Sequence, residues 1–127
     1  MILDPSRLDM ARPLHAAVCI VGAGAAGITL ACELDGAGLS VLLLDAGPVQ
    51  GGDEASQDPY EGSSDGVHAT PRFFRRRGFG GTTAIWGGRC VPYDPIDFEA
   101  RTHVAASGWP VAYDEVARHY PKAMDYC

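Results

Sequence analysis

The chain has 127 residues, of which 10 are Lys or Arg and 16 are Asp or Glu, so its formal net charge is −6. This acidic balance gives no reason to expect a nucleic-acid partner, and no apolar stretch reaches the roughly 20 residues of a membrane-spanning helix. The hydrophobic fraction of 46% is ordinary for a globular chain whose length suits one domain, or part of one.

The cysteines and the N-terminal residues favour a cytoplasmic protein. Cys19, Cys32, Cys90 and Cys127 show neither a C-x-x-C pair nor metal-ligand spacing, so we expect no metal site. Because Cys19 falls in a predicted strand and Cys32 in a predicted helix, buried free thiols are expected, which fits a reducing compartment. Residues 1–15 form a lead-in whose acids and prolines do not suit a secretory signal.

The first informative stretch is a short apolar run that stops at three glycines. Residues 15–21 are rich in β-branched side chains and predict a buried parallel strand. Gly22, Gly24 and Gly27 follow with the spacing G-x-G-x-x-G, and residues 28–34 have helical periodicity. In this setting Gly22 permits the tight turn, Gly24 lets a pyrophosphate approach the backbone, and Gly27 lets the helix pack on the strand.

A second strand and an acid follow at the spacing of a nucleotide-binding unit. Residues 40–45 form an apolar run ending in Asp45, about twenty residues beyond the glycines, where a ribose-binding carboxylate belongs. The helix start at Ala25 and Ala26 offers N–H groups to phosphates, and the small residues Ala46 and Gly47 suit a neighbouring adenosine. A βαβ crossover without a ligand is the alternative. The combination predicts an α/β fold with a Rossmann-like βαβ unit that binds an adenine dinucleotide.

A second glycine-rich stretch spans residues 75–89. Residues 49–70 before it are polar, without an apolar period, and predict an exposed excursion with no assigned chemistry. A run of arginines alone favours a solvated basic patch, but glycine pairs follow this one. Gly80 and Gly81 let the backbone approach a ligand, and Thr82 and Thr83 supply hydroxyl donors. Trp86 suits a core position or a cofactor wall equally well.

Together these motifs resemble the glucose–methanol–choline (GMC) family of FAD-dependent oxidoreductases. The resemblance rests on Val-Gly-Ala-Gly-Ala-Ala-Gly, Leu-Leu-Leu-Asp-Ala-Gly-Pro and Gly-Gly-Thr-Thr-Ala-Ile-Trp-Gly-Gly-Arg, and is closest to the bacterial sugar dehydrogenase and pyranose oxidase branch. It covers most of residues 16–127. It implies that FAD contacts the pyrophosphate glycines Gly22, Gly24 and Gly27, the ribose acid Asp45, the loop residues Gly80, Gly81, Thr82 and Thr83, and, near the isoalloxazine, Trp86 and Gly87.

Two positions depart from the family pattern. Asp45 stands where the family usually has the longer glutamate, and an aspartate should still bond the ribose. Ile85 stands where pyranose oxidases carry the histidine that bonds covalently to flavin. Because isoleucine cannot form that link, non-covalent FAD is expected.

The rest of the chain supplies structure and no expected catalytic residue. Residues 94–101 predict a turn entering a short helix, and residues 113–126 a helix kinked at Pro121. Phe98 and Trp109 are most simply core residues. His103 and His119 lack a partner acid at a telling spacing, so neither is assigned acid–base chemistry.

The resemblance implies an oxidoreductase acting on CH–OH groups of alcohols or sugars, with hydride transfer to flavin N5. The catalytic base, a histidine in the family, lies far along a much longer chain, and the remaining sheet strands and substrate domain have no counterpart here. We therefore expect an N-terminal FAD-binding part of such an enzyme, inactive alone. The alternatives are another flavoenzyme class (a monooxygenase or amine oxidase), a non-catalytic nucleotide-binding protein, and a simple NAD-binding module.

Overall fold

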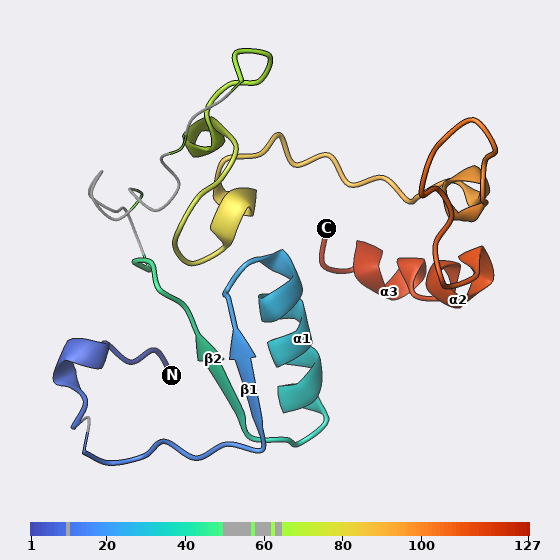
Figure 1. Ribbon diagram of the computed structural model, residues 1–127. Helices are drawn as coiled ribbons and strands as arrows, with labels where there is room; N and C mark the ends of the chain where they lie inside the picture. The colour runs from blue at the N-terminus through green and yellow to red at the C-terminus, as the bar shows by residue number, and fades with distance from the viewer. Residues whose placement is uncertain (10, 50–56, 58–61, 63–64) are drawn as a thin grey trace. The chain divides into compact units, whose positions relative to one another are not determined.

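The computed structural model describes residues 1–9, 11–49, 57, 62 and 65–127, so most of the predicted excursion lies outside the described residues. The chain divides into two compact units, Met1–Trp86 and Gly87–Cys127. The helices and strands, labelled in Figure 1, are β1 (Val18–Val21), α1 (Ala25–Gly36), β2 (Val41–Leu44), α2 (Tyr113–Ala117) and α3 (Tyr120–Met124).

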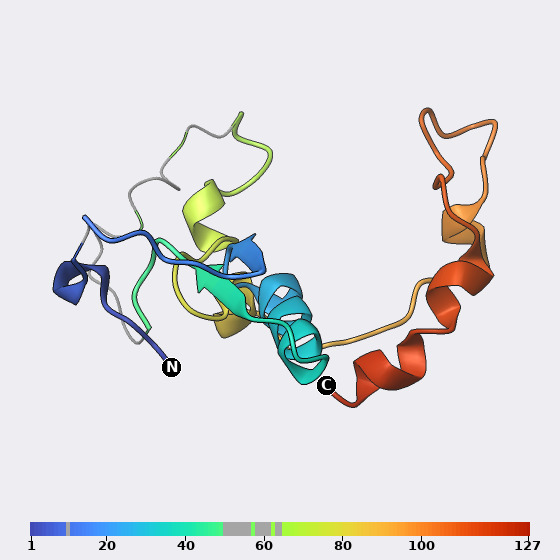
Figure 2. The ribbon, with the colours of Figure 1, turned by 90° about the horizontal axis from the view of Figure 1, so that it is seen from below.

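A parallel βαβ unit organises the first unit, as the sequence predicts. β1 pairs with β2 in parallel, from Val18 opposite Val41 to Val21 opposite Leu44. The ladder extends at both ends, because Val18 N donates to Ser40 O at 3.2 Å and Gly22 N donates to Leu44 O at 2.7 Å. α1 packs beside both strands (Figures 1 and 2). The Rossmann-like fold class is confirmed, with strands shorter than the apolar runs that predict them.

α1 is bounded by glycines at both ends. Gly24 is its N-cap in an extended conformation, so the helix begins at Ala25 and includes the third glycine of the motif. Beyond the helix, Gly38 adopts a φ of +83°, which favours glycine, and Leu39 N donates back to Leu34 O at 3.0 Å. Gly38 is therefore the glycine stop of α1.

The prediction that Cys19 and Cys32 are buried is wrong, because both are exposed. Ile20 faces α1, since a Cβ on Gly27 would meet Ile20 Cγ2 at 3.5 Å. Neighbouring strand residues point to the opposite face, which leaves Cys19 on the side that α1 does not cover. Cys32 is exposed because a two-stranded sheet covers only one stripe of a helix.

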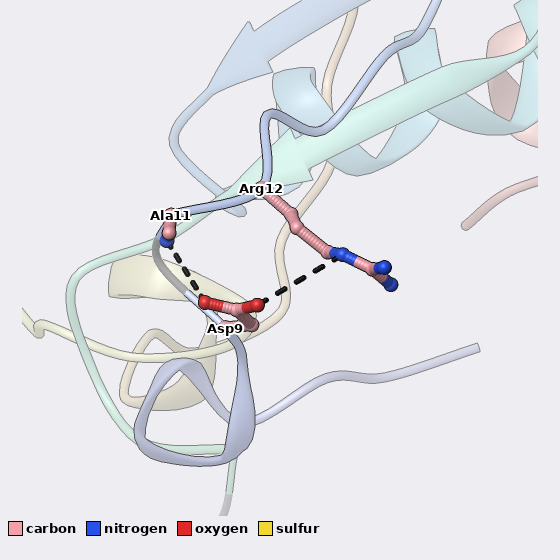
Figure 3. A network of polar contacts seen from close by, with 3 residues as sticks. All are labelled: Asp9, Ala11 and Arg12. Atoms are coloured by element: carbon pink, nitrogen blue, oxygen red, sulfur yellow. Dashed lines mark hydrogen bonds and ion pairs between the residues drawn. The ribbon is translucent and has the colours of Figure 1, made fainter.

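The N-terminal lead-in contains two local carboxylate turns. Asp4 accepts hydrogen bonds from Ser6 Oγ at 2.8 Å and Ser6 N at 2.9 Å, and these bonds lower the pKa of Asp4. Asp9 accepts from Ala11 N at 3.1 Å and lies 3.9 Å from Arg12 Nε (Figure 3). Both turns are exposed, so they order the segment locally.

The second unit is built on an aromatic cluster around Phe98. Phe98 is buried, and its ring contacts those of Tyr93, Trp109 and Tyr113 at centroid distances of 5.3 to 6.2 Å. The short helix predicted after residue 94 is a single 3-10 turn, Pro95–Phe98. The prediction that Trp109 is a core residue is wrong, because its ring packs on Phe98 but its side chain remains 49% exposed.

The predicted kinked helix over residues 113–126 is instead two short helices. α2 ends at Ala117, and α3 begins at Tyr120 with Pro121 in its first turn. Proline suits that position because the first N–H groups of a helix have no internal acceptor. Within the described ranges of the chain, no helix is long and apolar enough to cross a membrane.

Candidate functional site

Two of the three motif glycines are required by the chain itself. Gly22 has a φ of +104°, which turns the chain sharply after β1. A Cβ added to Gly27 would lie 1.9 Å from Gly22 O, so only glycine lets α1 pack this close to the turn. These are the roles that the spacing predicts for them.

Gly24 is different, because none of the residues that the structure describes requires a glycine there. Its φ is −79°, and no heavy atom lies within 4 Å of the position a Cβ would take. The residue caps the start of α1, where the first N–H groups have no intrahelical acceptor and the helix dipole is positive. The open space leaves room for a ligand to approach the backbone, which is the role that the spacing predicts for Gly24.

The second glycine loop packs directly on the first. Gly80 N donates to Ala23 O at 2.8 Å, and Gly80 forms a parallel bridge with Gly24. Gly81 has a φ of +56°, and a Cβ on it would lie 3.2 Å from Gly24 Cα. Two motifs more than fifty residues apart in the sequence thus meet in one backbone cradle.

The two threonine hydroxyls have different roles in this cradle. Thr83 Oγ1 donates to Gly80 O, so its proton holds the loop and is not available to a ligand. Thr82 Oγ1 accepts from Arg76 N at 3.4 Å, and its own proton remains free to donate outward. The structure therefore supports Thr82 as a ligand donor and gives Thr83 a structural role.

Asp45 ties the glycine turn to the end of β2. Its Oδ2 accepts from Ala23 N at 2.7 Å, and its Oδ1 accepts from Gly47 N at 2.8 Å. Each oxygen has a second lone pair that can receive a ribose hydroxyl. Gly47 is required by packing, because its Cβ would lie 2.3 Å from Gly78 N.

Two clefts adjoin the glycine turn and share Val21, Gly22, Gly24 and Thr82. The first, about 510 Å³, is also lined by Leu44, Asp45, Ala46, Arg76, Arg77, Gly78 and Gly81. The second, about 550 Å³, is also lined by Ile20, Ala25, Ala26, Gly27, Leu30, Gly80 and Thr83. Clefts of this size accommodate organic ligands. One extended molecule crossing the glycine turn could use both.

Some residues behave differently from their predicted roles. Trp86 is 47% exposed and lines neither cleft. Gly87 is the first residue of the second unit and belongs to that separate body. Its predicted place beside an isoalloxazine ring stays a prediction.

Arg76 and Arg77 are the site residues that sequence reasoning missed. Both are half-buried and line the first cleft. Gln57 fixes the backbone of Arg77: its Nε2 donates to Arg77 O at 2.9 Å, and its Oε1 accepts from Arg77 N at 2.8 Å. The feature of the sequence that could have indicated them is a run of arginines shortly before the glycine pair Gly80-Gly81. That signal cannot tell which of several consecutive arginines faces a ligand.

Within the residues that the structure describes, no group of three His, Cys, Asp or Glu side chains could hold a metal ion. No histidine lines either cleft. The chemical character of the site is therefore that of backbone N–H groups, one carboxylate, one free hydroxyl and two guanidinium groups. These groups suit binding of a phosphorylated, ribose-containing ligand.

Comparison with known protein families agrees with this geometry. Residues 20–78 match the model of the NAD(P)-binding Rossmann-like domain, a span that contains α1, β2 and the chain up to the second glycine loop. No curated protein and no solved structure matches the chain. The matched residues form a Rossmann-like dinucleotide-binding domain of the kind typical of oxidoreductases.

Proposed function

We propose that the dinucleotide is FAD and that this chain is the FAD-binding part of a GMC-type oxidoreductase acting on CH–OH groups of alcohols or sugars. The observation that carries the proposal is the open Cβ position of Gly24 beside the second glycine loop. A single glycine turn suffices for the pyrophosphate of NAD(P). The second loop, bonded to the first, extends the cradle along a longer ligand.

The residues divide the ligand between the two clefts. Asp45, Ala46 and Gly22 line the first cleft and suit the adenosine ribose and adjoining phosphate. Ala26 and Gly80 line the second, which includes the start of α1 and does not include Asp45. This division supports an extended ligand centred on Gly24.

When bound, a flavin supplies the hydride acceptor for alcohol oxidation. The residues of this chain bind and orient it: the backbone holds the phosphates, and Asp45 fixes the adenosine end. The proton acceptor for the substrate hydroxyl is proposed to come from outside these residues, because no histidine lines either cleft. Ile85 offers no nucleophile, so attachment through this position is non-covalent.

The rival cofactor is NAD(P), which the description of the matching family model favours. The rival flavoenzyme classes, monooxygenases and amine oxidases, share the first glycine motif. The second glycine loop, Gly80 and Gly81 followed by Thr82, favours the GMC type over both.

Isothermal titration of the purified chain with FAD, NAD⁺ and NADP⁺ distinguishes the cofactors. We expect FAD to bind at least tenfold more tightly than either nicotinamide dinucleotide, a difference of about 1.4 kcal/mol. Tighter binding of NAD⁺ or NADP⁺ would replace the flavin proposal by a nicotinamide one. No binding of any of the three would remove the dinucleotide function from this chain.

A further inference from the structure

The run Arg75-Arg76-Arg77 is split by the fold into one exposed and two half-buried side chains. Arg75 is exposed and lines neither cleft, whereas Arg76 and Arg77 are half-buried and line the first cleft beside Asp45. A solvated basic patch would leave all three in water. The structure therefore separates members of this run that the sequence does not.

The arginine segment is fixed against the cradle. Arg76 N donates to Thr82 Oγ1 at 3.4 Å, and both backbone polar groups of Arg77 are held by the amide of Gln57. Phe79, two residues further along the chain, is also held in place, because its backbone N donates to Pro48 O at 3.1 Å. These bonds hold the wall of the cleft in place before any ligand arrives.

Arg76 brings a positive charge to this wall and makes no ion pair with any described residue. The exposed Asp9–Arg12 ion pair belongs to the lead-in, and neither of its residues lines this cleft (Figure 3). Asp45 lines the same cleft, but its described hydrogen bonds go to the backbone N–H groups of Ala23 and Gly47, and it forms no described ion pair with Arg76. Partial burial of an unpaired guanidinium is unfavourable, and an anion in the cleft would relieve that cost.

We propose that Arg76 is a positioning residue that binds the diphosphate of the adenine dinucleotide. The inference rests on the nucleotide site proposed above and assigns its charge recognition to one side chain. A guanidinium presents a planar pair of donors that matches phosphate oxygens. The neighbouring N–H groups at Gly24 give the diphosphate a second set of donors. A ribose 2′-phosphate is the other source of this chemistry, but the carboxylate of Asp45 in the same cleft repels it.

The test is calorimetric titration of the 127-residue chain with adenosine, ADP and 2′-phospho-ADP-ribose. Arg76→Gln removes the positive charge, whereas Arg76→Lys keeps the charge but lacks the planar pair of guanidinium donors. Arg75→Gln is the matched control. We expect Arg76→Gln to weaken ADP binding by about tenfold to a hundredfold, the usual value of a hydrogen bond to a charged group. Arg75→Gln should change it less than twofold, and adenosine binding should be unchanged in all variants.

The outcomes separate this inference from the proposed function. Wild-type binding of ADP with no loss in Arg76→Gln would overturn the inference and leave the nucleotide site intact. A larger loss for 2′-phospho-ADP-ribose than for ADP would also overturn it, in favour of the 2′-phosphate. Absence of ADP and FAD binding by the wild type would overturn both. Far-UV circular dichroism of each variant, with partial recovery of ADP binding in Arg76→Lys, excludes a folding defect as the cause.

Discussion

The three glycines of the G-x-G-x-x-G motif differ in what the structure requires at each position. Gly22 is required by its φ of +104°, Gly27 by a Cβ position 1.9 Å from a carbonyl oxygen, and Gly24 by neither. The G-x-G-x-x-G spacing predicts all three positions. It cannot separate Gly22 and Gly27, which the fold itself requires, from Gly24, because that distinction depends on the backbone angle and the packing at each position.

A matched set of alanine substitutions tests this distinction. Gly24→Ala should fold normally and lose at least tenfold in dinucleotide affinity, because its methyl group enters the ligand space. Gly27→Ala should lower the free energy of unfolding by about 1 to 3 kcal/mol through overpacking. Gly36→Ala, whose Cβ also meets nothing, is the control that should retain affinity. Thermal denaturation measures the change in stability, and calorimetry measures the dinucleotide affinity. An equal loss of affinity in Gly24→Ala and Gly36→Ala would contradict the hypothesis that the ligand lies beside Gly24.

Asp45 should matter to stability as well as to binding. Asp45→Ala leaves Ala23 N and Gly47 N without their acceptors, and we expect a loss of about 1 kcal/mol of unfolding free energy, the low end for a partly exposed group. Urea denaturation measures it, with the exposed Asp35→Ala as control. An unchanged midpoint would show that the carboxylate does not hold the glycine turn. The sequence predicts only a ribose-binding role for Asp45, because its structural role depends on how β2 meets the glycine turn.

At the scale of elements, hydrophobic periodicity predicts β1, α1 and β2 correctly. It does not predict which of their faces are buried. The apolar runs identify strands because β-branched residues pack well on a pleated surface. They contain no information on the number of neighbouring layers, so the burial of Cys19 was predicted wrongly. In the second unit, Pro121 predicts a break in the helix, but the break precedes Pro121 because this proline lies in the first turn of α3.

Cys127, beyond the end of α3, lies beside Cys90 near the start of the same unit. The Cys127 thiol, hydrogen-bonded to Cys90, raises the pKa of the Cys90 thiol. A raised pKa lowers the thiolate fraction at a given pH, and the thiolate is the reactive form. Cys127→Ala should therefore speed alkylation of Cys90 by iodoacetamide near pH 8, whereas Cys32→Ala should not. Peptide mass spectrometry over time measures both rates, and an unchanged Cys90 rate in Cys127→Ala would show that the two thiols do not interact.

At the scale of the whole molecule, the described residues bury little apolar surface. Ile20, Ala23 and Phe98 are the buried hydrophobic residues of the described ranges, while Val21 at the end of β1 is 83% exposed. The sequence predicts this outcome in part, because a parallel βαβ unit needs cover on both faces. Such a small core makes the free energy of ligand binding a large share of the total stability.

Ligand linkage should consequently be easy to detect. A dinucleotide at 100 times its Kd adds about 2.7 kcal/mol to the free energy of unfolding if it binds only the folded chain. Thermal denaturation with and without FAD should show a clear rise in Tm for wild type and a smaller one for Gly24→Ala at the same FAD concentration. Identical shifts in the two proteins would mean that the flavin acts away from the glycine turn.

The most direct test of the central claim is the visible absorption spectrum of the purified chain after incubation with FAD and removal of the excess. We predict a retained flavin spectrum that acid precipitation releases into the supernatant, because Ile85 offers no covalent link. Gly36→Ala should retain the flavin and Gly24→Ala should lose it. A chain that emerges colourless after incubation, or a Gly24→Ala variant as yellow as the wild type, would contradict the FAD cradle proposed here.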